Sequence, residues 1–137
     1  MCVFCKIAAG EIPSEIVFED DISVAFLDVD PLFPGHVLLV PREHYATLPE
    51  LPADKVGPFF QNAQKLVTAV QQACDAPGCF VGQNNVVSQS VPHLHVHIVP
   101  RRPKDGLRGF FWPKNHYESD EHKSKIADAI RQALAEA

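Results

Sequence analysis

Three histidines occupy alternate positions in the run His93-Leu94-His95-Val96-His97-Ile98-Val99, although the chain of 137 residues contains only seven histidines. Strict alternation of this kind is typical of a β-strand, in which side chains point to opposite faces in turn. We therefore expect the three imidazoles to share one face, with about 6.6–7 Å between successive positions. The intervening Leu94, Val96 and Ile98 would then lie on the other face, within a core.

A row of imidazoles suits two kinds of chemistry. A neutral imidazole can attack phosphorus, and a neighbouring histidine can donate a proton to the leaving group. The same row can instead bind a metal ion, because histidine is a common ligand for zinc, copper and nickel. A third interpretation is a row of solvated histidines on an exposed strand. Three histidines in strict alternation, in an apolar run that ends at Pro100, favour chemistry over that interpretation.

Cys2-x-x-Cys5 is the second candidate for chemistry. Its spacing fits a redox pair, half of a zinc site or two incidental cysteines. A thioredoxin-like redox pair belongs in a βαβ unit, which this sequence does not predict. Cys74 and Cys79 lack matching partners, and we interpret them as buried or free thiols.

The rest of the chain predicts the elements that position these residues. Short β-rich runs separated by turn signals predict strands, and apolar residues at helical spacing predict a long helix that begins near Asp54 and ends before Pro77. The other expected elements are a helical turn over 4–9, strands over 16–19, 23–27, 36–40 and 80–84, and the histidine strand.

A last helix, capped by Ser119, is expected to bury one apolar face made of Ile126, Ile130, Ala133 and Leu134. Strands in hairpins with helices inserted favour the α+β class, with an antiparallel β-sheet of about five strands, one long helix between strands and a C-terminal helix. At this length we expect a single domain over 1–137, with its core in 3–101 and a C-terminal extension over 102–137.

Composition limits the possible partners and the compartment. The hydrophobic fraction of 46% and the charged fraction of 21% are ordinary for a globular protein, and the net charge of −5 argues against nucleic acid as the main partner. No apolar run approaches the ~18 residues of a membrane-spanning helix, and the start lacks a signal-peptide pattern. We therefore expect a cytoplasmic protein that does not bind membranes, with its four cysteines outside disulfides.

Several motifs, in this order, resemble those of the histidine-triad family of nucleotide hydrolases and transferases. Besides the histidine run, the matching segments are Phe4-Cys5-Lys6-Ile7, Gly10-Glu11-Ile12-Pro13, Phe26-Leu27-Asp28, Pro31, Gly35-His36, Pro41-Arg42-Glu43-His44 and Gln89-Ser90-Val91. The resemblance covers the chain from Val3 to about Arg101. The sequence departs from the family pattern in three ways. The stretch between Asn85 and Gln89 is shorter than in many members, Ser88 stands where glycine is common, and Pro92 stands where an aromatic residue is frequent.

The resemblance implies a catalytic role for three histidines. His95 would attack the α-phosphorus of a purine nucleotide, such as a nucleoside phosphoramidate, and water would release the nucleoside monophosphate from the covalent nucleotidyl-histidine. His97 would help to protonate the leaving group, with His36 close by. The alternatives are a dinucleoside polyphosphate hydrolase and a zinc-stabilised nucleotide-binding protein with little turnover. A uridylyltransferase of the galactose-1-phosphate type fits less well, because that branch has glutamine in place of His97.

The resemblance also implies the residues that hold the nucleotide. Asp28 would accept hydrogen bonds from the ribose hydroxyls, although an Asx-turn before Pro31 explains this aspartate equally well. Phosphate oxygens would be held by Ser90, Gln89 and either Asn84 or Asn85, which otherwise form a solvated loop. The apolar wall under the purine would consist of Val3, Phe4, Ile7, Phe26 and Val29.

Family members with the same cysteine pair complete a zinc site with two histidines, which implies a structural site of Cys2, Cys5, His44 and His93 here. Because the protein would supply all four ligands, the metal would support the fold and leave no open position for water. Family members are commonly homodimers. The basic and aromatic segment 101–112 could cross to a partner subunit or stack on a substrate, or it is a proline-rich surface connection.

Overall fold

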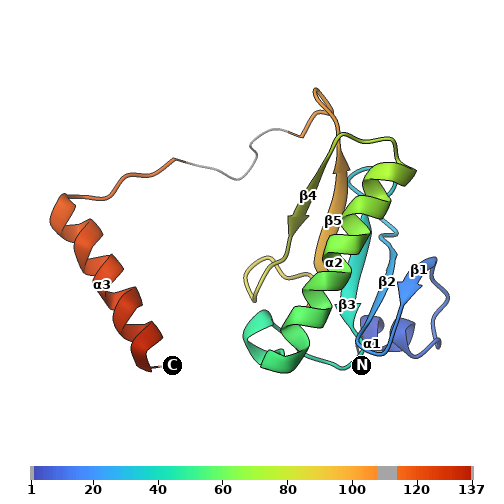
Figure 1. Ribbon diagram of the computed structural model, residues 1–137, viewed down its shortest axis with the longest axis horizontal. Coiled ribbons are helices and arrows are strands. Elements are labelled where there is room, and N and C mark those ends of the chain that lie inside the picture. Colours follow the sequence, from blue (N-terminus) through green and yellow to red (C-terminus); the bar gives the residue numbers. More distant parts are fainter. Residues whose placement is uncertain (1, 108–113, 137) are drawn as a thin grey trace. The chain divides into compact units, whose positions relative to one another are not determined.

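The structure is a computed structural model in which residues 2–107 and 114–136 are described (Figure 1). The aromatic end of the segment 101–112 falls on residues 108–113, outside the described residues. The chain divides into two units, Met1–Asp105 and Gly106–Ala137, and each is considered by itself.

The first unit is built on a five-stranded antiparallel sheet, which confirms the expected α+β class. Its spatial order is β1-β2-β3-β5-β4, so β3 and β5 lie side by side although they are far apart in the chain (Figure 1). The strands are β1 (Ile16–Glu19), β2 (Ser23–Leu27), β3 (Val37–Pro41), β4 (Gly78–Gly82) and β5 (Val96–Arg101).

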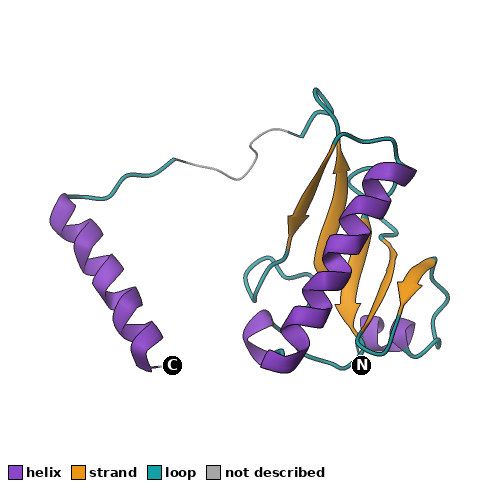
Figure 2. Ribbon diagram, viewed as in Figure 1, coloured by secondary structure: helices purple, strands orange, loops and turns teal. Residues whose placement is uncertain are grey.

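Helix α2 (Ala53–Ala73) crosses one face of this sheet, as Figure 2 shows. Its apolar stripe packs on the strand residues that point toward it, and Phe59 is fully buried there. Leu94, Val96 and Ile98 belong to the same core, as their alternation predicts. The histidine run therefore buries its aliphatic side against α2 and leaves its imidazoles on the opposite face.

Helix α1 (Val3–Ala8) lies on that opposite face and forms a second, smaller core. Phe4 packs edge-on against Phe26 of β2, with ring centroids 5.4 Å apart. Because Val24, Leu38 and Val40 join this cluster, β2 and β3 are buried on both faces, which explains their almost uninterrupted apolar sequences.

Three strands begin at other residues than the sequence pattern indicated, and β3 is shifted by a single residue, to Val37–Pro41. β5 starts only at Val96, because the N–H of Leu94 donates to the carbonyl of Tyr45, beyond the end of β3, and this bond draws the first two histidines out of the sheet. β4 starts two residues early, at Gly78, because its pairing with β5 runs from Gly78 opposite Arg101. A short 3₁₀ helix, η1 (Leu48–Glu50), precedes α2.

The second unit contains α3 (Asp120–Glu136). The Ser119 hydroxyl oxygen accepts the His122 N–H at 3.0 Å, so the predicted cap is present. The predicted burial is wrong, because no described residue of α3 is buried and Ile130 and Leu134 are exposed. Within this unit the described residues form no second helix or strand against which that face can pack. No helix in the described parts of the chain has the length and apolar character needed to cross a membrane.

Candidate active site

A cavity of about 390 Å³ lies on the α1 side of the sheet. His95 and His97 line it, together with Asp28, Ser90 and the apolar residues predicted to hold a purine: Val3, Phe4, Ile7, Phe26 and Val29. The structure thus brings together most of the residues that the resemblance pointed to. Asn84, Asn85, Gln89 and His36 do not line this cavity.

His95 is almost fully buried, and its ring is held in one tautomer. Its Nδ1 lies 2.7 Å from the backbone carbonyl oxygen of His93 and must donate a proton to it. The neutral ring therefore has a free lone pair on Nε2. Phe4 packs edge-on against this imidazole, with ring centroids 5.1 Å apart, and limits its rotation. The result is a fixed nitrogen nucleophile on the wall of the cavity.

His97 has the complementary tautomer, set by His36. The backbone N–H of Leu32 donates to Nδ1 of His36 at 3.1 Å, so the proton of the neutral His36 ring is on Nε2. This Nε2–H donates to Nδ1 of His97, 3.0 Å away. His97 must then carry its own proton on Nε2. The cavity wall therefore offers one bare imidazole nitrogen and one imidazole N–H, on rings whose centroids are 5.1 Å apart.

Burial also keeps the rings of His97 and His36 neutral. Desolvation lowers the pKa of His97 to about 4, and the neighbouring His95 and His36 act in the same direction, against a smaller opposite effect of Asp28. Desolvation likewise lowers the pKa of His36, again opposed by Asp28. Neutral rings at physiological pH are what the hydrogen-bond chain from Leu32 requires.

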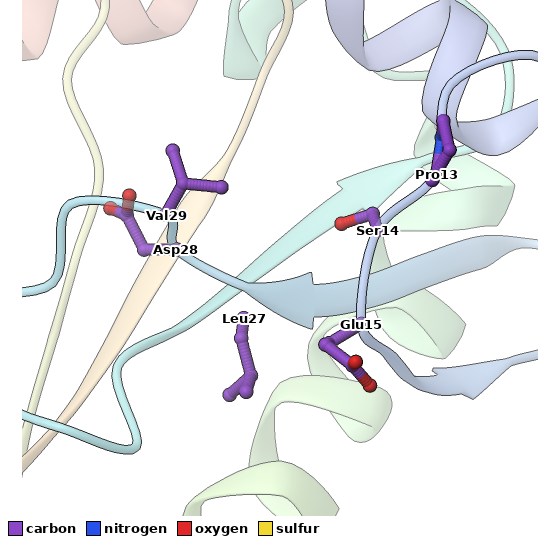
Figure 3. A pocket seen from close by; sticks show the side chains of 6 residues that line it. All are labelled: Pro13, Ser14, Glu15, Leu27, Asp28 and Val29. Atoms are coloured by element: carbon purple, nitrogen blue, oxygen red, sulfur yellow. The ribbon is translucent and has the colours of Figure 1, made fainter.

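Asp28 follows β2 and lines the cavity. Its Oδ1 accepts the Asp30 N–H at 2.9 Å, so the Asx-turn is present, while Oδ2 lies 3.7 Å from His36 Nε2. Figure 3 shows an adjoining pocket, lined by Leu27, Asp28 and Val29 at the end of β2 and by Pro13, Ser14 and Glu15 before β1; all of these except Glu15 also line the cavity. Val29 is 88% exposed, so its side chain is free to cover a ligand.

Most polar side chains of the loop before the histidine run form hydrogen bonds within the loop or with neighbouring segments. Asn84 Nδ2 donates to the Ser88 carbonyl, and Asn85 Oδ1 accepts the Leu48 N–H. The Gln89 amide donates to Ala46 and accepts from Val86. These side chains support the loop, and Ser90 is the polar residue of this group that reaches the cavity.

Two residues of this loop have a left-handed backbone. Ser88, which stands in the place of a common glycine, has φ 63°, and the β-branched Val86 has φ 72°. Glycine adopts such angles without strain, whereas they cost energy for a residue with a side chain, most of all for valine. The shortened loop therefore holds strain directly before the histidine run.

A second group of side chains, Cys2, Cys5, His44 and His93, converges next to the cavity, with potential ligand atoms all within 4.8 Å of one another. Nδ1 of His93 lies 3.4 Å and 3.5 Å from the two sulfurs, and Nδ1 of His44 lies 3.3 Å from Cys5 Sγ. Bond lengths of about 2.3 Å to sulfur and 2.0–2.1 Å to nitrogen around a tetrahedral zinc ion place such atoms about 3.5 Å apart.

The surroundings of His93 fit a metal ligand. Its Nε2–H donates to the Pro41 carbonyl at 2.9 Å, which leaves Nδ1 unprotonated and directed at the cysteine sulfurs. Desolvation lowers the pKa of His93, and the nearby His44 and His95 add to this effect, while the bond to Pro41 opposes it. Two thiols and two imidazoles in this arrangement are compatible with a tetrahedral zinc ion.

Asp28, His36 and His97 also bring three potential ligand atoms within 4.8 Å. Here the hydrogen bonds argue against a metal. The Leu32 N–H occupies Nδ1 of His36 and forces a proton onto Nε2, the atom that would have to bind the ion. This trio is therefore a hydrogen-bonded proton chain, unlike the cysteine-containing group.

Several residues that line the cavity were not predicted from the sequence, among them Ile12, Pro13, Ser14, Leu38 and Val91. Leu38 pairs with His97 in the register of β3 and β5, so it shares the face of the histidines. Successive side chains of β3 point to opposite faces of the sheet, but only the strand pairing shows which face meets the site.

Comparisons with known proteins agree with this site. The family model of the HIT domain matches residues 9–104. An uncharacterised HIT-like protein from Methanocaldococcus jannaschii is 40% identical, over 92% of this chain and 98% of that protein. An adenylylsulfatase from Arabidopsis thaliana is 33% identical, over 97% of this chain and 69% of that protein. An adenosine 5′-monophosphoramidase from Candida albicans is 31% identical, over 98% and 91% of the two chains.

Solved structures show the same architecture. A HIT family protein from Bacillus subtilis has a TM-score of 0.86 at 34% identity, over 96% of this chain and 95% of that chain. A zinc-bound histidine-triad protein from Mycobacterium smegmatis has a TM-score of 0.73 at 28% identity, over 99% and 97% of the two chains.

Proposed function

Because this chain belongs to the HIT family, we propose that it is a hydrolase that cleaves the bond between the α-phosphorus of a purine nucleotide and its leaving group. One observation carries the proposal: the bare Nε2 of His95 and the Nε2–H of His97 share one cavity. Relatives named adenylylsulfatase and adenosine 5′-monophosphoramidase support the reaction class.

In the first step Nε2 of His95 attacks phosphorus, and the bond from phosphorus to the leaving group breaks. The negative charge that develops on the departing atom is stabilised by the Nε2–H of His97, and this atom takes up one proton from water at that position; the attacking water of the second step returns one proton to solvent. The nucleotidyl group is then covalently bound to His95. Its positive imidazolium is stabilised at Nδ1 by the His93 carbonyl, which accepts the Nδ1–H.

In the second step water attacks the same phosphorus and displaces His95, and the nucleoside monophosphate leaves. Two displacements with a covalent intermediate divide one difficult step into two easier ones. We assign the phosphate oxygens to Ser90, the ribose hydroxyls to Asp28, and the purine to the apolar wall that contains Phe4 and Phe26. A purine suits this wall because its flat, apolar faces can pack against aromatic rings.

We also propose that Cys2, Cys5, His44 and His93 hold a structural zinc ion. When bound, the ion would join α1 to the residues that precede β5, with no ligand position left for substrate. The zinc-bound relative from Mycobacterium smegmatis supports this assignment. Metal analysis of the purified protein should find one zinc ion per chain, and this zinc should be lost in Cys5→Ser. A folded wild-type protein without metal would refute the zinc site.

We also propose that the chain forms a homodimer and that it is located in the cytoplasm. Exposed apolar residues favour self-association, namely Val81 on the edge strand β4 and Ile130 and Leu134 on α3. The four cysteines are free thiols in the structure, which suits a reducing compartment. Light scattering of the purified chain should give twice the monomer mass, and a monomer at micromolar concentration would contradict the dimer.

The test of function is AMP release from adenosine 5′-phosphoramidate by the wild type and by His95→Ala, side by side. The wild type should release AMP, and the variant should lose turnover while it still binds AMP. Turnover that survives in His95→Ala would refute the mechanism. If neither protein cleaves this substrate, dinucleoside polyphosphates are the next substrates to try, and binding without any turnover would make the chain a nucleotide-binding protein.

A further inference from the structure

Helix α1 carries two sets of side chains with different partners. Cys2, at its N-cap position, and Cys5 contribute sulfur to the candidate zinc site, while Phe4, between them, and Ile7 line the nucleotide cavity. The two sets alternate within six residues. Any force that holds the sulfurs in place therefore also holds the apolar wall of the cavity.

This helix has little stability of its own. It contains six residues, far fewer than the about 12–15 that an isolated helix needs in water, and its N-cap side chain makes no capping hydrogen bond. The described contacts that retain it are the second apolar core, the Arg42 guanidinium bond to the Ala8 carbonyl, and the convergence of Cys2 and Cys5 on His93 and His44.

The same group reaches the nucleophile by a second route. His93 offers its ring to the two cysteine sulfurs and its backbone carbonyl to Nδ1 of His95. Phe4 contacts both residues, since its ring lies edge-on to those of His93 and His95, with centroid distances of 6.0 Å and 5.1 Å. The ligand His93 thus bonds to the nucleophile without lining the cavity.

We propose that zinc at Cys2, Cys5, His44 and His93 is a positioning device for nucleotide binding: it docks α1, and with it Phe4, against His95, and it fixes the His93 carbonyl that orients the nucleophile. The ion takes no part in the chemistry. This inference rests on the proposed function for its nucleotide, but the docking of α1 is a property of the free protein. Removal of zinc should therefore open α1 locally and weaken nucleotide binding.

The experiment compares the full-length protein loaded with zinc and stripped by a chelator. Hydrogen exchange would report on the amides of Lys6, Ala9 and Glu11, whose N–H groups donate to carbonyls within and just before α1, and on the amides of α2 as a reference. Stripping should speed exchange in 6–11 by about tenfold or more and leave α2 protected. The affinity for AMP, by calorimetry, should fall by about 10–100-fold and return when zinc is added back.

His44→Ala is the sharpest variant, because His44 is exposed and lines no part of the cavity. It should show the same changes as the stripped wild type, whereas Cys79→Ser, at a thiol of β4 outside the group, should show none. Unchanged exchange in 6–11 on stripping would overturn the inference, and so would equal loss of protection in α2, since zinc would then stabilise the whole fold. If the zinc-loaded protein binds no AMP, the proposed function fails, and the exchange data still decide the docking of α1.

Discussion

His36 donates a hydrogen bond from Nε2–H to Nδ1 of His97 over 3.0 Å, although the two residues lie 61 positions apart in the chain. β3 and β5 are neighbours in the sheet, and this pairing brings the residue before one strand to the second residue of the other. The bond sets which nitrogen of His97 carries a proton, and hence which atom it can offer to a substrate.

The titration of His97 tests this arrangement. Its pKa is lowered to about 4 because burial and the neighbouring imidazoles disfavour the charged ring, so it should stay neutral well below the ordinary value of 6.5. The unfolded chain then binds more protons between these two pH values, and His97 should make the protein less stable as the pH falls through that window. Nitrogen NMR of the imidazoles should give both the pKa and the Nε2–H tautomer, and a midpoint near 6.5 would contradict the burial argument.

Substitution of His36 tests the same bond through catalysis. In His36→Leu the donor to His97 is lost, and the rate of AMP formation should fall by about 100-fold or more, since loss of tautomer control in other catalytic triads costs at least this much. His36→Gln supplies an amide N–H and should retain more activity. Equal activity of the leucine and glutamine variants would show that His36 fills space rather than orienting His97.

Substitutions on the two faces of the sheet should have different effects, one on the stability of the fold and the other on AMP binding. Phe59→Ala removes a fully buried ring on the α2 face and should cost about 3–5 kcal/mol of unfolding free energy, with little change in the AMP affinity of the folded protein. Phe4→Ala, on the other face, should weaken AMP binding directly. Urea denaturation and calorimetry measure the two effects, and unchanged AMP affinity in Phe4→Ala would remove this ring from the nucleotide site.

Ser90 is expected to contact the phosphate. Ser90→Ala should lower kcat/KM by about tenfold or more, because a hydrogen bond to a charged group is worth about 1.5–3 kcal/mol. Asn84→Ala serves as the matched control, since its amide bonds to the Ser88 carbonyl and does not line the cavity. A larger loss in the asparagine variant would mean that the loop rearranges to bring Asn84 to the phosphate.

Gly35, directly before His36, offers a test of the backbone. It has φ +101°, and a Cβ there would collide with Cys74 Sγ, whereas Gly10 has φ +78° and open space around it. Gly10→Ala should therefore show the cost of backbone strain alone, and Gly35→Ala a larger loss of stability from strain and collision together. Adding Cys74→Ala to Gly35→Ala should restore part of the difference, and equal melting temperatures of the two single variants would contradict it.

Regular patterns allowed much of this fold to be predicted from the sequence. The alternation of Leu94, Val96 and Ile98 correctly placed these residues in one core, and the helical spacing in α2 did the same for Phe59 and Leu66. Contacts that depend on single hydrogen bonds could not be predicted from the sequence. The bond from Leu94 to Tyr45 delays the start of β5 to Val96, and no local pattern marks it.

Buried polar residues limited the prediction in the same way. Asn62 lies in the apolar stripe of α2, although amide side chains are mostly exposed in proteins. It is instead 4% exposed and donates to Asp20 and Ser23, which are distant in sequence. In the site, the residue types predicted the chemistry, but the roles of the three imidazoles follow from carbonyl and N–H partners that only the folded chain supplies.

The stereochemical course at phosphorus tests the central claim most directly. An adenosine 5′-phosphoramidothioate of one configuration at phosphorus would be hydrolysed in heavy-oxygen water, and the configuration of the product determined. Attack by His95 followed by attack of water inverts phosphorus twice, so net retention is expected. Net inversion would mean a single direct attack by water and would contradict the nucleotidyl-His95 intermediate.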